Sequence, residues 1–132
     1  MTETLFTKII NGEIPSYKVA EDDQFYAFLD ISPLAVGHTL VVPKKPVDYI
    51  FDLEDKVLAD LMVYAKKIAK AIESVVPCAR IGVAVIGLEV PHTHIHLVPI
   101  NDVGDIDFKK PRVELSHEEM SQVAKEIADN IK

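Results

Sequence analysis

Three histidines alternate along a short run that a proline bounds at each end, Pro91-His-Thr-His-Ile-His-Leu-Val-Pro99. Successive side chains of an extended strand point to opposite faces, so this spacing places His92, His94 and His96 on one face, roughly 7 Å apart from one to the next. A neutral imidazole, which exists near pH 7 because histidine titrates at about pH 6.5, can act as a nucleophile, a base or a metal ligand. The run therefore predicts a functional site on one strand.

Three interpretations of this run compete. Rings that only face solvent are disfavoured, because the run holds three of the chain's five histidines in register. A zinc site is the second interpretation, since two histidines at i and i+2 of a strand can share one Zn²⁺. His38 is available as a further ligand, but no Cys, Asp or Glu lies close by on the same face of the run. The third is catalysis at phosphorus, in which the middle ring attacks and its neighbours handle charge and protons. The residues alone leave zinc and catalysis open.

Regularly spaced apolar residues predict three helices that flank or interrupt the strands. The first covers Thr4–Asn11, and a long second helix runs from a cap at Asp52 to about Val75. The capping box Ser116-x-x-Glu119 predicts the start of a final helix at Ser116.

Apolar runs bounded by turn residues predict five strands. They are Tyr17–Ala20, Gln24–Leu29, Gly37–Pro43, Ala79–Ile86 and Val90–Val98. Short strands in hairpin-like succession, with a long helix between the third and the fourth, indicate an α+β fold with a five-stranded, mainly antiparallel sheet and short helices at both ends. His38 lies near the start of the third strand, in the same small sheet as the histidine run, whereas we expect His117 to be solvated. The segment Asn101–Val113 looks irregular.

The composition is that of a globular protein with a single domain. The net charge of −7 argues against binding duplex nucleic acid through its phosphates, although a local site can still bind a small phosphorylated ligand. The single cysteine, Cys78, excludes an internal disulfide and suits a reducing compartment. No apolar run reaches the roughly 18 residues of a membrane span, and the mostly polar Met1–Thr7 does not resemble a signal peptide. We expect a cytoplasmic protein that binds neither nucleic acid nor membrane.

Three segments together resemble a known family. LFTKIINGEIP (Leu5–Pro15), FLDISPLAVGHTLVVPKK (Phe28–Lys45) and the histidine run follow one another in the order and spacing of the histidine triad superfamily. The similarity spans roughly Thr4 to Pro99 and is closest to the nucleotide-binding branch of that superfamily. It implies one domain over residues 1–132, with a triad core at about 4–100 and a C-terminal extension with a helix at about 101–132.

The resemblance also implies roles for the histidines. His94 resembles the nucleophile whose Nε2 attacks the α-phosphorus, forming a nucleotidyl-histidine that water then hydrolyses. Its Nδ1 would donate to a backbone carbonyl, that of His92, and so fix the tautomer that leaves Nε2 unprotonated. His96 would contact the phosphate oxygens or the leaving group, and His38 would support the site through His92. No metal or other cofactor is required in this scheme.

Nucleotide recognition follows from the same resemblance. Asp30 matches the acidic residue that accepts hydrogen bonds from the ribose 2′- and 3′-hydroxyls, although from the residues alone it is a turn residue of Asp-Ile-Ser-Pro. An apolar slot for the purine matches residues that would otherwise be ordinary core: Leu5, Phe6, Ile9, Ile14, Phe28 and Ile31. The implied partners are a purine nucleotide or nucleoside monophosphate derivative, and a second copy of the chain in a homodimer.

The sequence departs from the family pattern just before the histidine run. Within Ile86–Pro91, Leu88 stands where a glutamine is expected and Glu89 lies near the position of a hydroxyl residue that assists the leaving group. Glu89 is either a general acid or a solvent-facing residue, and its charge would repel a phosphate. Pro46 and Ile100 replace a histidine and an arginine that are often found in the family. These departures leave the leaving group and the substrate open.

The resemblance thus implies a hydrolase or transferase of nucleoside monophosphate derivatives, such as phosphoramidates or mixed anhydrides. Two alternatives belong to other classes: a protein that binds purine nucleotides without cleaving them, and a zinc protein that uses the His-x-His-x-His strand.

Overall fold

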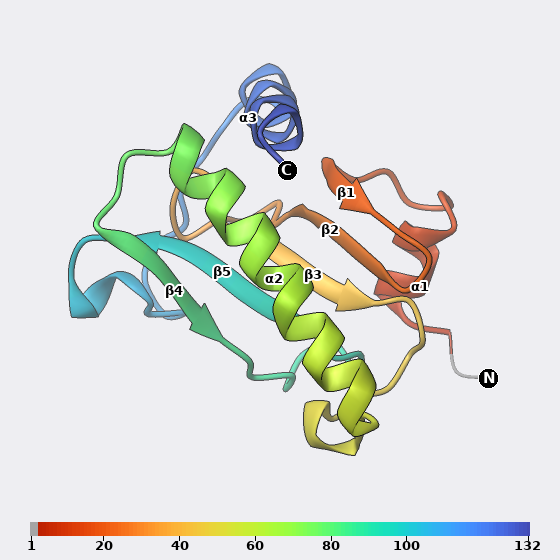
Figure 1. Ribbon diagram of the computed structural model, residues 1–132. Helices are drawn as coiled ribbons and strands as arrows, with labels where there is room; N and C mark the ends of the chain where they lie inside the picture. The colour runs from red at the N-terminus through yellow and green to blue at the C-terminus, as the bar shows by residue number, and fades with distance from the viewer. Residues whose placement is uncertain (1–2) are drawn as a thin grey trace.

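The computed structural model describes residues 3–132 and contains one five-stranded antiparallel sheet with the strand order β1-β2-β3-β5-β4 (Figure 1). The strands are β1 (Lys18–Glu21), β2 (Phe25–Leu29), β3 (Thr39–Pro43), β4 (Arg80–Ala84) and β5 (Ile95–Ile100). Every neighbouring pair is antiparallel. The α+β prediction is confirmed. The domain expected over residues 1–132 includes Met1 and Thr2, which lie outside the described residues.

Within residues 3–132, three α-helices accompany the sheet: α1 (Leu5–Ile10), α2 (Asp55–Val75) and α3 (His117–Asp129). The capping box predicted at Ser116 is present, because the Ser116 side chain accepts from the amide of Glu119. The predicted start of the long helix at Asp52 was wrong. Asp52 ends a short 3₁₀ turn, η1 (Ile50–Asp52), and the buried, extended Leu53 separates that turn from α2.

The strand expected over Val90–Val98 begins only at Ile95, so His96 is the one member of the histidine run that lies within β5. Pro91 has no amide hydrogen to offer a neighbouring strand. The next two amides are used elsewhere: that of His92 donates to Val90 O at 2.8 Å, and that of Thr93 to Val47 O at 2.7 Å. The first two histidines of the run are therefore held by a loop.

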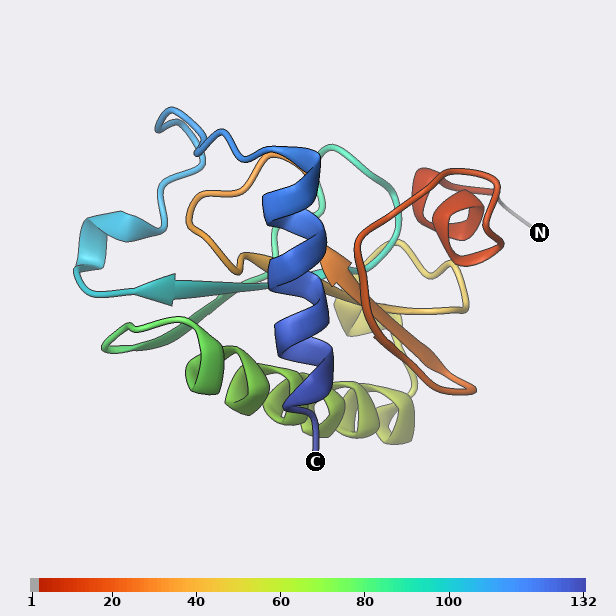
Figure 2. The same ribbon diagram turned by 90° about the horizontal axis from the view of Figure 1, so that it is seen from above.

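Two apolar clusters lie on opposite faces of the sheet. α2 and α3 contribute to the larger one, whereas α1 covers part of the other face, as Figure 2 shows from above. The smaller cluster consists of Phe6, Ile9, Tyr26, Phe28, Leu40 and Val42. β2 and β3 are buried along their whole length because both of their faces are covered. No helix within residues 3–132 is long and apolar enough to cross a membrane.

Candidate active site

His92 is fully buried, and both of its ring nitrogens are engaged. Nε2 lies 2.7 Å from the carbonyl oxygen of Pro43, and Nδ1 lies 2.7 Å from Oγ1 of Thr4. A carbonyl only accepts, so Nε2 carries the hydrogen and the Thr4 hydroxyl donates to Nδ1. Burial lowers the pKa of His92, which keeps the ring neutral. His92 therefore ties the start of α1 to the end of β3 and positions its neighbours.

His94 is oriented by the backbone of the same loop. Its Nδ1 donates to the carbonyl oxygen of His92 at 2.7 Å, which is the hydrogen bond that the family resemblance implies. In the neutral ring the lone pair is then on Nε2. Phe6 packs edge-on against the His94 ring, with centroids 5.0 Å apart. This packing and the hydrogen bond leave the ring one orientation.

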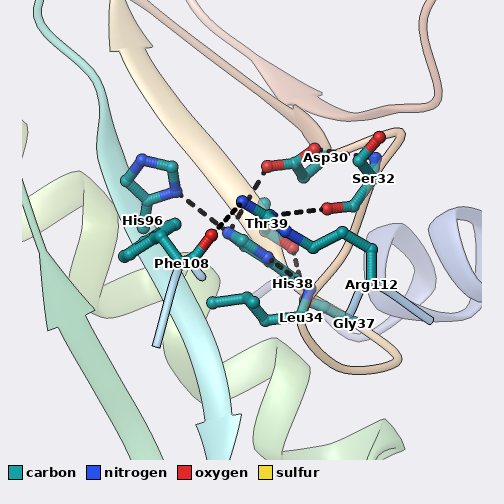
Figure 3. A network of polar contacts seen from close by, with 9 residues as sticks. All are labelled: Asp30, Ser32, Leu34, Gly37, His38, Thr39, His96, Phe108 and Arg112. Atoms are coloured by element: carbon teal, nitrogen blue, oxygen red, sulfur yellow. Dashed lines mark hydrogen bonds and ion pairs between the residues drawn. The ribbon is translucent and has the colours of Figure 1, made fainter. Parts of the chain in front are cut away.

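His38 and His96 form a directed chain of hydrogen bonds (Figure 3). The amide of Leu34 donates to His38 Nδ1 at 3.0 Å, and His38 Nε2 lies 3.0 Å from His96 Nδ1. Because an amide only donates, His38 must carry its hydrogen on Nε2 and donate it to His96, which in turn carries its hydrogen on Nε2. His38 was expected to act through His92. That expectation was wrong, because its bond is to His96.

Burial is the main reason why the pKa values of the two histidines in this series of hydrogen bonds are lowered. Together with the nearby His96 and Arg112 it lowers the pKa of His38 to about 3. Burial, with His94 and Arg112 in its surroundings, lowers the pKa of His96 to about 4. Both rings are thus neutral near pH 7, which the alternating pattern of donors and acceptors requires.

A cavity of about 380 Å³ opens on the α1 side of the sheet, within the range of small-ligand sites. His94 and His96 line it, with ring centroids 5.0 Å apart. All of the residues expected to hold the nucleotide line it too: Asp30, Leu5, Phe6, Ile9, Ile14, Phe28, Ile31 and Glu89. Leu5 and Ile31 are exposed at its rim. A larger hollow of about 790 Å³ lies beside the start of α2 and contains none of the histidines.

Asp30 is the turn residue that its sequence context predicts, and it also lines the cavity. Its Oδ1 accepts from the amide of Ser32 at 2.8 Å, which is the hydrogen bond of an Asx turn. Its Oδ2 lies 3.6 Å from His38 Nε2. Burial raises the pKa of Asp30, and the Ser32 amide and Arg112 oppose that rise. The turn therefore fixes one carboxylate oxygen and leaves the other beside the cavity.

Comparison with protein-family models decides the family. The model described as HIT domain matches residues 11–103. The chain belongs to the HIT family. A HIT-like protein of Borreliella burgdorferi is 37% identical over 139 residues, which cover 99% of this chain and 100% of that protein. Adenosine 5′-monophosphoramidase hnt1 of Schizosaccharomyces pombe is 35% identical over 131 residues, 97% of this chain and 98% of that protein.

A solved structure agrees with this assignment. The crystal structure of a Hit-like protein involved in cell-cycle regulation from Bartonella henselae superposes with a TM-score of 0.85 at 34% identity, covering 97% of this chain and 96% of that one. The fold described above is therefore the HIT fold over nearly the whole chain, including α3.

Three residues outside the matched range 11–103 contact the site's histidines or line its cavity, although the sequence did not point to them. Phe108 packs on His96, with ring centroids 4.7 Å apart, and Arg112 lines the cavity beside it. Both come from the segment that looked irregular, where no periodicity marks which side chains turn inward. Thr4 was expected only as a helix start, and its bond to His92 joins positions 88 residues apart.

One group in the HIT site has metal-ligand chemistry. Ligand atoms of Asp30, His38 and His96 all lie within 4.8 Å of one another. Metal binding through His38 Nε2 requires that nitrogen to lose its hydrogen while Nδ1 still accepts from the Leu34 amide. Such a ring would be an imidazolate anion in a buried position, which is costly. The hydrogen bonds therefore favour the neutral chain of donors over a zinc site.

Proposed function

We propose that this HIT protein cleaves nucleoside monophosphate derivatives at the α-phosphorus, through a nucleotidyl intermediate on His94. The observation that carries the proposal is the hydrogen bond from His94 Nδ1 to the carbonyl of His92, which assigns the lone pair to Nε2 in a ring that lines the cavity. The similarity to a fission-yeast protein named adenosine 5′-monophosphoramidase supports a phosphoramidate of a purine nucleotide as the substrate class.

In the first step His94 Nε2 forms a bond to phosphorus while the bond from phosphorus to the leaving amine breaks, and the amine takes up a proton from solvent. His96 presents an N–H on its cavity side, since its Nδ1 accepts from His38. That N–H stabilises negative charge on a phosphate oxygen or on the leaving group. Water then attacks the phosphorus, the bond from phosphorus to His94 Nε2 breaks and the water gives up a proton to solvent, which releases the nucleoside monophosphate and restores His94.

The lining of the cavity also suits the rest of a nucleotide. Phe6 and Phe28 form an apolar part of the wall, with ring centroids 5.6 Å apart and an interplanar angle of 64°, and a purine can pack against it. Asp30 offers a carboxylate oxygen that can accept from ribose hydroxyls, and charge-assisted bonds of this kind are the strong ones. We propose no metal or cofactor for the reaction.

A mass measurement tests the intermediate. Wild-type protein turning over adenosine 5′-phosphoramidate is quenched in alkaline denaturant, because phosphorus–histidine bonds hydrolyse in acid. We expect an adduct of adenylyl mass on His94, and its loss in His94→Ala, whereas His117→Ala on α3 keeps the adduct. Normal turnover by His94→Ala would contradict the proposal. Nucleotide binding without any turnover by the wild type would instead establish a non-catalytic binding protein.

We further propose a homodimer that forms through the edge strand β4. This strand exposes Val83, and the chain beyond it exposes Ile86 beside Phe51 of η1, whose side chain is 72% exposed. An uncovered edge strand with apolar neighbours is the kind of surface that pairs with a second copy. Sedimentation that shows only a 14.7 kDa species would contradict the dimer.

We also propose the cytoplasm as the compartment of this protein, because its single cysteine, Cys78, suits a reducing environment.

A further inference from the structure

The chain between β5 and α3, residues 101–115, returns on the α1 side of the sheet (Figure 2). We call it the return segment. Ile106 packs against Gly82 of β4 so closely that a Cβ on that glycine would lie 2.5 Å from Ile106 Cδ1. Further along, the amide of Val113 donates to the carbonyl of Pro33 at 2.9 Å. These contacts hold the return segment to the sheet and to the loop that follows β2.

Arg112 of the return segment is anchored at the wall of the cavity. Its Nη1 donates to the carbonyl of Ser32 at 2.8 Å and its Nη2 to that of Phe108 at 3.3 Å (Figure 3). The guanidinium carbon also lies 5.5 Å from the centroid of the Phe108 ring, and that ring packs on His96. The Phe108 ring therefore contacts both the Arg112 guanidinium and the His96 ring.

Negative side chains outnumber positive ones among the described residues that line the cavity. Among the described residues that line it, Arg112 is the single arginine or lysine, whereas Asp30 and Glu89 are both carboxylates. A phosphate group that enters a cavity lined by two carboxylates is repelled unless a cation compensates. A guanidinium remains charged at every accessible pH and has five N–H donors, of which the described contacts use two.

We propose that Arg112 binds the α-phosphate of the nucleotide and is the residue by which the site distinguishes a nucleotide from a nucleoside. The inference depends on the proposed function only for the identity of the ligand, a purine nucleotide. The two carbonyl bonds hold the side chain in place before the ligand arrives, so little side-chain entropy is lost on binding.

The test compares the dissociation constants of AMP and adenosine, two ligands that differ only by the phosphate, by titration calorimetry. We expect Arg112→Gln to weaken AMP roughly 10- to 100-fold, the range of a hydrogen bond to a charged group, and to change adenosine less than twofold. Arg112→Lys keeps the charge without the planar fork and should fall between. The control is Lys109→Gln, which removes the same charge from an exposed position of the return segment and should change neither constant.

Equal weakening of AMP and adenosine by Arg112→Gln would overturn the proposal, because it would mean that Arg112 only holds the return segment in place. An unchanged AMP constant would overturn it as well. If Arg112→Gln does not fold, the wild-type protein alone still tests the proposal. Its preference for AMP over adenosine must decline with added salt, and a salt-independent preference contradicts a charge contact. Because binding needs no turnover, an AMP site that depends on Arg112 without a His94 adduct would refute the proposed reaction alone.

Discussion

His38 Nε2 lies 3.0 Å from His96 Nδ1, and the amide of Leu34 sets the direction of the bond between them. An amide donates to His38, His38 donates to His96, and His96 therefore presents an N–H to the cavity. The neighbouring His94, fixed by the carbonyl of His92, presents a lone pair in the neutral ring. Two rings with centroids 5.0 Å apart thus have opposite polarity toward the same space. This arrangement suits the proposed attack by His94 at phosphorus, because a donor beside the nucleophile stabilises the negative charge that develops.

Replacement of His38 should slow the reaction, although His38 itself does not contact the substrate. His38→Phe leaves His96 without its hydrogen-bond donor, so the ring can adopt the other tautomer. We expect kcat to fall roughly 10- to 100-fold, less than the loss of a direct oxyanion donor, with KM changed less than threefold. His38→Gln, whose amide can still donate toward His96, should recover part of the rate in steady-state assays.

The matched control for this prediction is His117→Gln on α3, an exposed histidine whose Nδ1 lies 2.9 Å from the hydroxyl of Tyr17. It should leave both constants as they are. A His38→Phe enzyme with wild-type kcat, or an equal loss in His38→Phe and His38→Gln, would refute a role in setting the tautomer of His96.

Asp30→Asn should weaken the preference for ribose over deoxyribose. The Asx turn fixes Oδ1 through the amide of Ser32, which leaves Oδ2 for the sugar. Loss of a charge-assisted bond is worth roughly 10- to 100-fold, so kcat/KM for a ribonucleotide substrate should fall by that factor while the value for the 2′-deoxy analogue changes little. Parallel losses for both sugars would show that Asp30 acts on the loop and not on the ribose.

Activity should be insensitive to chelators. The chain of donors from Leu34 through His38 to His96 puts a hydrogen on the nitrogen that a metal would need. We expect unchanged turnover and an unchanged melting temperature after dialysis against EDTA, and less than 0.1 equivalent of zinc by elemental analysis, where roughly one is expected of a structural or catalytic site. Stoichiometric zinc that is lost together with activity would reverse this conclusion.

The fold could be predicted from the sequence because each strand and helix has its own local pattern. The family resemblance also indicated that Asp30 and the apolar slot lie near the histidine run, and these residues line one cavity together with His94 and His96. The loop that holds His92 was not foreseen, because an alternating pattern gives no sign that the amides of His92 and Thr93 donate to the carbonyls of Val90 and Val47.

The return segment shows why part of the site stayed hidden. Phe108 and Arg112 are four residues apart in a stretch without periodicity, and Arg112 is held by the carbonyls of Phe108 and of Ser32 in the loop after β2. Backbone carbonyls are the same in every sequence, so a contact that depends on them leaves no pattern of residue types. The partner of His38 was missed as well, because the family resemblance implied His92 whereas the hydrogen bond is to His96.

The folded protein should become less stable at acidic pH, because its buried histidines take up protons less readily than those of the unfolded chain. The pKa of His38 is lowered to about 3 and that of His96 to about 4, while the unfolded chain takes up these protons near pH 6.5. A lowered folded pKa contributes stability that is present above pH 6.5 and is lost as the pH falls toward the folded value. The raised pKa of Asp30 acts in the opposite direction, since a protonated carboxyl favours the fold at low pH.

Between pH 7.5 and 5 each of these two histidines should reduce the free energy of unfolding by about 2 kcal/mol. Urea unfolding at the two pH values measures the change. His38→Phe should lose less stability over this range than the wild type, whereas His117→Gln, from an exposed position, should follow the wild type. A wild-type protein with equal stability at both pH values would show that the rings are protonated in the fold.

Gly37→Ala should destabilise the turn that leads into His38. Gly37 has φ +92°, where an L side chain is strained, and a Cβ would lie 2.9 Å from Cγ2 of Val76. We expect a loss of about 2–3 kcal/mol in urea unfolding, from strain and crowding together. The matched control is Gly12→Ala, with φ +81° and no atom within 4 Å of its Cβ, which should lose only about 1 kcal/mol. Equal losses would mean that Val76 moves aside freely, and that the turn before His38 is less tightly packed than the structure shows.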